Sequence, residues 1–517
     1  MKNFKILALI LACIMLITLL SACGSNSGTA SSSQSQSGES SQAVSGTGGL
    51  KQAETTDATI ILYGESSKRM SEFSKNEFHD KVMDTLNVNV KIQYLPWTEY
   101  AKGKTELMLS SGEKFTTYTD TAFMAKCVSK GYYADLTEAA EKYAQNLKKY
   151  CGGDKAFAIW KVNGKLYGLT FGNKPNAGEG YLIIARQDLL EEVGMTEVKT
   201  VEDVEKFYEL SKQKHPDYLG SARGWSLNIF NGVINSEMNI YRPNNFIMTD
   251  GNKLDDPAVY DYYASEEYKQ ACEISRRWNQ KGIIPSFAMS NPAQADSSFY
   301  AGKALFGIGA SYRVFEYEDA VRKAAPNAVF KNYYLGDTTK KPLMSRGEYS
   351  TAFAVSANVK GAELDGYVKL IDLLQSSQEW TDFIIYGVKG KDYDISADGQ
   401  LKLINTDTLF DTWLPDNINF TRFRDYITKE QIDTYKNWNT GSIPQKDVGF
   451  AFDMEPVKTE YAQMQAVEQE YFEPMTQGFK DYKSNIDVAL KKLKTAGIDK
   501  FLSEYEKQFT EFLKNKK

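Results

Sequence analysis

Apolar residues dominate the beginning of the chain and then give way to polar ones. An almost wholly apolar run covers Ile6–Leu20, and a stretch rich in Ser, Gly, Gln and Thr follows over Gly24–Gln52. The apolar run is shorter than the roughly 20 residues that span a bilayer, and Lys2 and Lys5 precede it, as in a secretory signal peptide. The polar stretch has no apolar period, so we expect it to be disordered.

Beyond this stretch, short β-branched runs alternate with helical patterns. The predicted order is strand 58–63, helix 70–86, strand 88–94, helix 97–109 and strand 115–118. This alternation predicts a parallel sheet with crossover helices, in which ligands bind at the carboxyl ends of the strands. The residues that follow or end the first and third strands are therefore expected to bind ligand: Glu65, Ser66, Thr119 and Asp120.

The segment Leu20-Ser21-Ala22-Cys23 resembles the lipobox of bacterial lipoproteins. The resemblance implies a signal peptide over 1–22, acylation of the Cys23 thiol (palmitate being one such lipid) and a linker over 23–52. Because two or more acyl chains anchor a protein stably, we expect a domain held at the extracellular face of the cytoplasmic membrane. A chance cysteine after an ordinary signal peptide is the alternative.

Composition narrows the functional classes. About 460 residues beyond position 52 exceed a single core, so two or more domains are expected. The chain has 61 Lys and Arg against 67 Asp and Glu, and without Lys2 and Lys5 its net charge falls from −6 to −8. Nucleic-acid binding, which needs clustered basic side chains, is not expected. His79 and His215 are the only histidines, too few for most His-based catalytic or metal sites.

Short segments in a fixed order along most of the mature chain carry a family resemblance. They are 107–113, 131–136, 162–169, 184–194, 278–284, 300–307, 353–358, 457–462 and 496–500. Their sequences, among them Val-Asn-Gly-Lys-Leu-Tyr-Gly-Leu at 162–169, resemble the extracellular solute-binding proteins of carbohydrate ABC transporters, which include maltose-binding protein. The last two segments resemble the C-terminal extension of the long lipoprotein members.

The resemblance implies an α/β fold of the periplasmic-binding-protein type, with two lobes, an interlobe ligand cleft and extra C-terminal helices. Lobe 1 is expected over 53–172 plus 346–380, and lobe 2 over 173–345 plus 381–517. A ligand that bridges the lobes closes them, because the bridging contacts exist only in the closed state.

Aromatic rings and polar groups are expected to contact different parts of the sugar. A sugar offers an apolar C–H face to rings and hydroxyls to acids, amides and Arg. Rings near small polar residues or strand ends are expected to stack on it: Trp225, Tyr312, Trp413 and Trp438. Other rings are expected in the core, namely Trp97, Trp278 and Trp380. For Trp160 the sequence does not decide between the core and the ligand site. Many relatives carry Pro-Asp where this chain has Phe115-Thr116, which points to Asp120 as the replacement.

Two local features leave alternatives open. The segment Asp394–Asp398 matches the first half of a calcium loop, but the twelfth position is Asn405 in place of Glu. A β-hairpin with an Asp-Gly turn between Tyr393 and Leu403 is favoured. One disulfide can form among the cysteines beyond Cys23, and the sequence does not show which, among Cys127, Cys151 and Cys272.

We therefore expect a membrane-anchored, monomeric solute-binding protein that captures an oligosaccharide and delivers it to an ABC transporter permease. It is expected to need no catalytic residue, metal or cofactor. A secreted glycan hydrolase or lyase is the alternative from another class, with acids such as Glu65, Asp120 and Asp416 as its carboxylate pair. A sugar sensor of a membrane kinase would use the same cleft. An oligopeptide ligand also stays open, and the sequence does not identify the sugar.

Overall fold

The computed structural model describes most of the chain from residue 51 to residue 515. The described range excludes 65, 97–98, 100–102, 171, 173–174, 179–181, 222–239, 252, 286, 288–291, 336–342, 346–350, 406–416 and 451. The predictions made for Cys23, Glu65, Trp97, Trp225 and Trp413 therefore lie outside the described residues.

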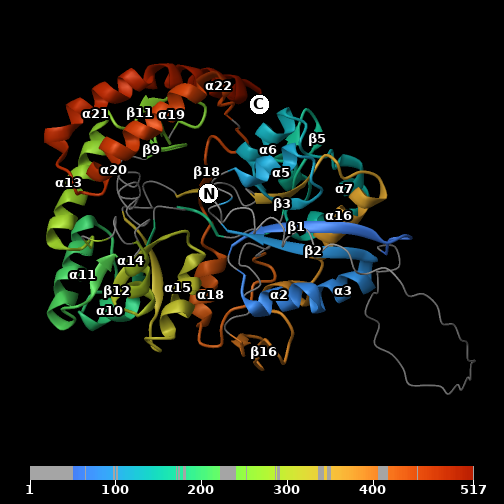
Figure 1. The fold of residues 1–517 in the computed structure, drawn as a ribbon. Helices are drawn as coiled ribbons and strands as arrows, with labels where there is room; N and C mark the ends of the chain where they lie inside the picture. Colours follow the sequence, from blue (N-terminus) through green and yellow to red (C-terminus); the bar gives the residue numbers. More distant parts are fainter. Residues whose placement is uncertain are drawn as a thin grey trace, which may run out of the picture. The chain divides into compact units, whose positions relative to one another are not determined.

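The first sheet forms where the strand–helix alternation predicted it (Figure 1). β1 (Thr56–Tyr63) runs parallel to β2 (Val88–Leu95) on one side and to β3 (Thr116–Asp120) on the other. β15 (Thr351–Val355) pairs antiparallel with β3 and with β6 (Leu169–Thr170). The strand order is β2-β1-β3-β15-β6, so the predicted parallel strands are confirmed and a later segment of the chain completes the sheet.

Short helices and a two-stranded ribbon surround this sheet. They are α2 (Lys68–Lys75), α3 (Glu77–Leu86), α5 (Lys104–Ser110), α6 (Thr121–Ser129), α7 (Thr137–Tyr143), α8 (Gln145–Tyr150), α9 (Gly153–Ala158), β4 (Lys161–Val162), β5 (Lys165–Leu166), α16 (Ala362–Leu373) and α17 (Gln378–Tyr386). The single helix predicted over 70–86 is divided, because Asn76 leaves the helical region with φ −113° and ψ −87°. Trp160 and Trp380 are buried in this core, which confirms the prediction for Trp380 and resolves Trp160.

The second sheet has the order β13-β7-β12-β8. Its strands are β7 (Leu182–Arg186), β8 (Leu219–Ser221), β12 (Ala304–Gly309) and β13 (Phe330–Tyr334). Every residue of β7 and β12 is buried. Gly307 is required on β12, since a Cβ there would lie 2.7 Å from the Tyr317 ring. Trp278 is buried, so its predicted core position is confirmed.

The helices around the second sheet have mostly amphipathic sequences. They are α10 (Gln187–Glu192), α11 (Val201–Lys214), α13 (Glu266–Lys281), α14 (Pro292–Tyr300), α15 (Arg313–Arg322) and α18 (Lys429–Lys436). Both histidines have surface partners: His79 contacts Asp80 and Asn89, and His215 contacts Glu192. Both therefore occupy structural surface positions.

Two crossings connect the sheets, from β6 to β7 and from β13 back to β15. Residues of the two crossings meet a later segment of the chain, and we call these three segments together the junction: residues 175–178, 343–345 and 438–445. Backbone hydrogen bonds join them, with Gly178 N–H donating to Met344 O at 2.9 Å and Ile443 N–H to Leu343 O at 2.9 Å. Within the junction, β14 (Met344–Ser345) runs parallel to β18 (Ile443–Pro444).

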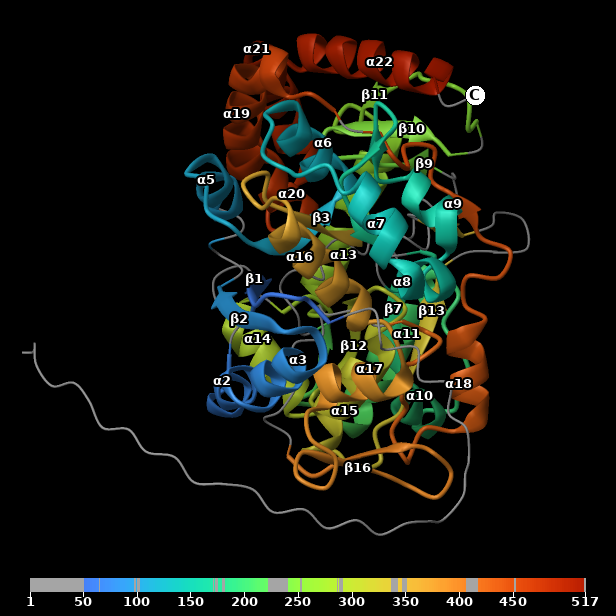
Figure 2. The same cartoon turned by 90° about the vertical axis from the view of Figure 1, so that its right-hand side faces the viewer.

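The third junction segment leads into the C-terminal helices, drawn in red in Figures 1 and 2. These are η2 (Glu455–Val457), α19 (Lys458–Val467), the π-helix η3 (Glu468–Phe472), α20 (Glu473–Thr476), α21 (Tyr482–Ala496) and α22 (Ile498–Asn515). They share a core with α13 and with β10 (Ile247–Asp250), which pairs with β9 (Ile240–Tyr241) and β11 (Tyr260–Asp261) in a small sheet. Ser275 Oγ on α13 donates to Thr476 O at 2.6 Å, so the extension is bound to the helix that also covers the second sheet.

The first core extends beyond the lobe boundary expected at residue 380. Ile384, Tyr393 and Leu401 belong to the same core as the first sheet. Arg69 on α2 reinforces this packing, with Nε donating to Asp392 Oδ1 at 2.9 Å and Nη2 to Oδ2 at 2.7 Å. Apolar burial therefore places residues up to Leu401 with the first sheet, whereas the sequence had assigned them to lobe 2. The rest of the lobe division stays a prediction.

The favoured hairpin is confirmed. β16 (Tyr393–Ile395) pairs antiparallel with β17 (Leu401–Leu403), and Asp394 lies opposite Lys402. Among the described residues, no group of three or more His, Cys, Asp or Glu side chains is arranged to hold a metal. The three cysteines in this range are free and buried, and burial raises the thiol pKa of each to about 12: Cys127, Cys151 and Cys272.

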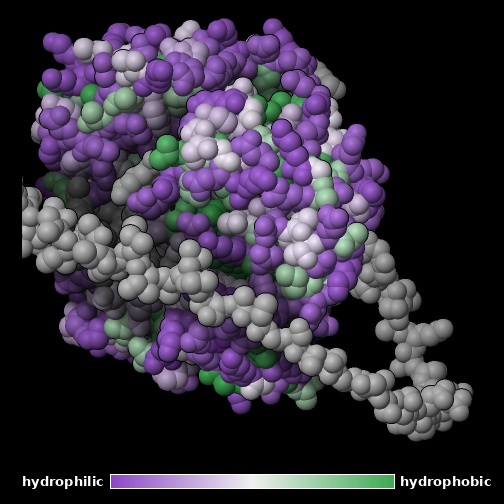
Figure 3. All heavy atoms as spheres, turned by 45° about the vertical axis from the view of Figure 1, so that its right-hand side comes forward, coloured by the Kyte–Doolittle hydropathy of each residue, from purple (hydrophilic) through white to green (hydrophobic). Residues whose placement is uncertain are grey.

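Hydrophilic residues cover most of the face shown in Figure 3. Within the described part of the chain, no helix has both the length and the apolar character needed to cross a membrane.

Candidate functional site

The carboxyl ends of β1 and β3 lie at the same edge of the first sheet, because the strands are adjacent and parallel. Asp120 ends β3 and caps α6: its Oδ1 accepts a hydrogen bond from Phe123 N–H at 2.8 Å. Such a cap satisfies one of the free N–H groups of the first helical turn. The Asp120 side chain remains half-buried and is therefore available at this edge.

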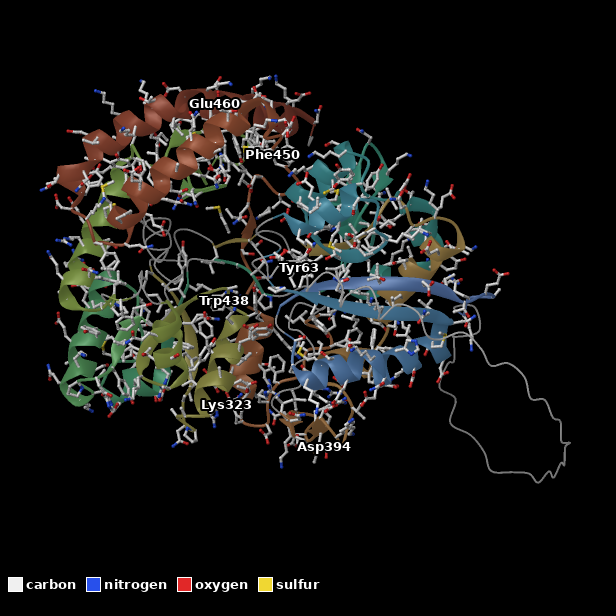
Figure 4. The ribbon with its side chains drawn as sticks, in the orientation of Figure 1. Tyr63, Lys323, Asp394, Trp438, Phe450 and Glu460 are labelled. Carbon is white, nitrogen blue, oxygen red and sulfur yellow. The ribbon has the colours of Figure 1, made fainter. Side chains whose placement is uncertain are left out.

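Neighbours of Asp120 differ in what they can offer a ligand. Thr119 is fully buried, and its hydroxyl donates to Asp120 O at 3.1 Å, so it supports the strand end. Tyr63 ends β1 (Figure 4), its buried hydroxyl hydrogen bonds to Thr105 Oγ1, and burial raises its pKa. Ser66 is exposed just before Ser67, whose Oγ caps α2. We call Ser66, Thr119 and Asp120 the edge residues.

Tyr312 lies between the second sheet and the junction. It is half-buried and immediately precedes α15, three residues after the end of β12. The preceding residue, Ser311, is buried and donates from Oγ to Pro175 O at 2.6 Å. Asn332 Nδ2 on β13 donates to Ser311 O at 2.9 Å. These bonds fix the backbone of Tyr312 beside the first junction segment.

Trp438 is part of the junction itself (Figure 4). Its indole Nε1 donates to Ala177 O at 2.9 Å, and the side chain is half-buried. The next residue, Asn439, accepts two backbone N–H groups at one oxygen, from Asn176 at 2.9 Å and Ala177 at 3.0 Å. Trp438 therefore has a structural hydrogen bond that the sequence prediction did not include.

The candidate residues thus fall into two groups. The edge residues come from the first sheet, while Tyr312 and Trp438 both lie next to residues 175–177. Sequence reasoning missed Ser311 and Asn439, whose side chains hydrogen bond to the backbone of the first junction segment next to these rings. The sequence holds no local signal for either one, because their backbone partners lie far away along the chain.

Two acids with strongly raised pKa values are buried beside the two sheets. Burial raises the pKa of Asp372 to about 6 and that of Glu318 to about 7. Asp372 accepts from Leu147 N–H at 2.9 Å, and Glu318 from Phe330 N–H at 2.9 Å. Asp372 lies on α16, beside the first sheet, and Glu318 on α15, beside the second. Glycosidase carboxylates share one cleft, so these two do not form such a pair.

The structure has two α/β sheets that are joined by crossing segments. Polar strand ends lie on the first sheet, and the Tyr312 ring lies beside the second. This arrangement is typical of one class of protein. It is the class of two-lobe ligand-binding proteins. The chain belongs to the bacterial extracellular solute-binding protein family, whose sequence pattern matches residues 76–379. The family predicted from the sequence is therefore confirmed. A second pattern, the domain of unknown function DUF3502, matches residues 447–514, which form the C-terminal helices.

Individual relatives agree with this assignment. The chain is 24% identical over 539 residues to a carbohydrate ABC transporter substrate-binding protein of Streptococcus pneumoniae serotype 4, with 100% of both proteins covered. The fold of the present chain matches that of the N-glycan transport solute binding protein of S. pneumoniae in complex with Man1GlcNAc. That match has a TM-score of 0.69 and 21% identity, and it covers 89% of this chain and 99% of the other.

A further structural match is the alginate-binding protein AlgQ2 without calcium ion. It has a TM-score of 0.59 and 15% identity, and the match covers 89% of this chain and 98% of that protein. These similarities confirm the predicted two-lobe α/β fold.

Proposed function

We propose that the protein is a lipid-anchored solute-binding protein that captures an oligosaccharide outside the cell and delivers it to the permease of an ABC transporter. The observation that carries the proposal is the similarity over the full length of the chain to a carbohydrate ABC transporter substrate-binding protein. The names of two proteins with the same fold also give saccharide ligands, an N-glycan and alginate. In this function the protein acts as a monomer and needs no cofactor.

The proposed ligand-binding residues combine acids, hydroxyls and rings. They are Glu65, Ser66, Thr119, Asp120, Trp225, Tyr312, Trp413 and Trp438. The Asp120 carboxylate is suited to accept sugar hydroxyls, because charge-assisted hydrogen bonds are stronger than neutral ones. The Tyr312 ring is suited to a C–H face of the sugar. Thr119 acts through the backbone it supports, and Trp438 through the face of its ring.

A panel of oligosaccharides tests this function by thermal shift. A ligand that binds only the folded protein at one hundred times its dissociation constant adds about 2.7 kcal/mol of apparent stability. We expect at least one oligosaccharide to raise the melting temperature, and to be recovered unchanged by chromatography after overnight incubation. A product ladder that an acid-to-amide change abolishes would support the hydrolase or lyase instead. Stabilisation by peptides alone would also contradict the proposal.

Membrane anchoring is tested separately at Cys23. Because the thiol is the site of acylation in the proposed lipoprotein, Cys23→Ser should move the protein from the membrane fraction into the medium. Cys127→Ser, which removes a buried thiol in the folded domain, is the matched control and should leave the protein in the membrane fraction. Mass spectrometry that finds an unmodified mature N-terminus would contradict anchoring without affecting the sugar-binding proposal.

A further inference from the structure

A cavity of about 700 Å³ lies between α15, the hairpin strand β17 and residues 421–426. Its volume is within the range of small-molecule sites, roughly 300–1,000 Å³. Two cores contribute to it: α15 packs with the second sheet, whereas Ile385, Tyr386 and Leu401 pack with the first. Among the candidate ligand residues that are described, Tyr312 lines this cavity, and the edge residues do not.

Aromatic rings form part of the cavity wall, and buried rings pack against one of them. Phe315 is half-buried, with its ring centroid 5.5 Å from that of Phe423 and 5.2 Å from that of Tyr435. Both supporting rings are buried. Tyr312 stands one helical turn before Phe315. The cavity therefore presents ordered ring surface, which suits the C–H face of a pyranose.

Most charged groups around the cavity neutralise one another. Arg424 Nε donates to Asp319 Oδ2 at 2.5 Å. Arg422 holds Asp382, with Nη2 donating to Oδ2 at 2.9 Å, and its Nη1 donates to Gly399 O at 3.0 Å. These pairs tie the cavity walls together. They engage most donors of the two guanidinium groups, and Arg424 Nη1 is buried without a hydrogen-bond partner in the described part of the chain.

Two lysines of the lining differ from these arginines. Lys323 immediately follows the C-terminal end of α15 (Figure 4), and Lys402 lies on β17. Both are exposed, and within the described part of the chain neither forms an ion pair. Glu316 is engaged by Arg313 at 3.3 Å, so the exposed Asp425 is the lining acid without an ion pair among the described residues. The amines give the cavity a small positive excess.

We propose that this cavity is an accessory site for a carboxylate-bearing sugar ring, such as a uronate or a sialate. The ring stacks on Phe315 and Tyr312, and its carboxylate pairs with Lys323 and Lys402. The inference rests on the proposed function and extends it, since it assigns an acidic sugar to a cavity that shares Tyr312 with the proposed ligand-binding residues. Lysine suits this role because its ammonium group is a mobile point charge that reaches a carboxylate from several directions. The acid can be a free monosaccharide or the terminal residue of the captured oligosaccharide.

Titration calorimetry on the full mature protein distinguishes these two sources. The free probes are methyl glucuronide and its uncharged counterpart, methyl glucoside. The linked probes are the panel oligosaccharide terminated by glucuronate and the same oligosaccharide terminated by glucose. We expect the acidic member of at least one pair to bind about tenfold more tightly, which corresponds to about 1.4 kcal/mol. A preference for the free acid indicates an independent site, and a preference only in the linked pair indicates a terminal subsite.

The double variant Lys323→Gln/Lys402→Gln tests the assignment to this cavity. It should abolish the acid preference and leave the affinity for the neutral oligosaccharide unchanged. Lys360→Gln, at an exposed lysine outside the cavity, is the matched control and should keep the preference. Phe315→Leu, which keeps apolar volume but removes the ring, should weaken binding of the acidic probe about tenfold. Thermal melts of all variants show whether each is folded.

Three results would overturn the accessory site. They are the absence of any acid preference in the wild type, a preference that survives in the double lysine variant, and an equal loss in Lys360→Gln. None of these results affects the proposed function while the neutral oligosaccharide still binds. If no oligosaccharide binds at all, the proposed function itself fails.

Discussion

The edge of the first sheet and the junction both carry residues that the sequence marked for ligand binding, yet the structure uses them differently. At the edge, Asp120 binds one backbone N–H and remains half-buried. At the junction, Trp438 and Asn439 bind the crossing segment at Asn176 and Ala177. A polar residue at a strand end or in a loop therefore indicates two things equally well, a ligand contact or a side chain that fixes a chain crossing.

The largest expected effect concerns Glu318, which is buried on α15, the helix that Tyr312 immediately precedes. Burial raises the pKa of Glu318 to about 7 from its ordinary value of 4.5. The folded chain therefore holds this proton more tightly than the unfolded chain. The resulting stability is fully present below about pH 4.5 and is lost as the pH rises to about 7. Glu318→Gln does not titrate, so its stability relative to wild type should improve by about 3 kcal/mol from pH 4.5 to 7.5.

Chemical denaturation at several pH values measures this change. Glu430→Gln, the same change at an exposed position on α18, is the matched control. A difference between Glu318→Gln and wild type that stays constant with pH would show that Glu318 does not titrate as its burial implies.

The next effect separates a junction side chain from a ligand contact. Asn439→Ala removes the acceptor of two backbone N–H groups in buried residues, and unpaired buried groups cost about 1–3 kcal/mol each. We expect the free energy of unfolding to fall by about 2 kcal/mol. Asn439→Asp keeps the acceptor oxygen and should be less affected. If Asn439→Ala melts like wild type but loses the sugar, Asn439 is a ligand residue.

At the edge of the first sheet, we expect the Asp120 carboxylate to contribute more to sugar affinity than to stability. Asp120→Ala removes both the α6 cap and the carboxylate, whereas Asp120→Ser keeps a capping oxygen. Losing the cap costs about 1 kcal/mol of stability. We expect Asp120→Ser to retain most of the stability but to bind the oligosaccharide about tenfold more weakly, as titration calorimetry would show. Normal affinity in Asp120→Ser would remove Asp120 from the site.

The smallest effect is expected for Trp438→Phe, which keeps a ring and removes the indole N–H. Losing its hydrogen bond to Ala177 O should cost about 1 kcal/mol of stability. A stacking ring would be retained, so sugar affinity should change by less than threefold, about 0.6 kcal/mol. A large loss of affinity with an unchanged melting temperature would place the indole N–H on the sugar.

These contrasts also show what the sequence could and could not provide. The parallel strands of the first sheet were predictable, because runs rich in β-branched residues, such as Ala58–Tyr63, are bounded by turn residues. The break at Asn76 was not, since a single non-helical residue does not interrupt the apolar period of α2 and α3. The packing of Tyr393 and Leu401 against the first core depends on long-range burial, which local patterns do not encode.

The candidate site was predictable to a similar degree. Strand order and the family resemblance located Asp120 at a strand end. The same reasoning could not distinguish Thr119, whose side chain is buried, from its half-buried neighbour. Residues adjacent in a strand point to opposite faces, but the sequence does not show which face is covered. The bonds of Trp438 and Asn439 join residues more than 260 positions apart, so only the fold reveals them.

The structure of the protein with the oligosaccharide identified by the panel tests the central claim most directly. We predict a sugar hydroxyl within hydrogen-bonding distance of the Asp120 carboxylate, with the Trp438 indole still bound to Ala177 O. A sugar bound away from the edge of the first sheet, or a Trp438 indole that has left the junction to hydrogen bond to the ligand, would contradict the claim.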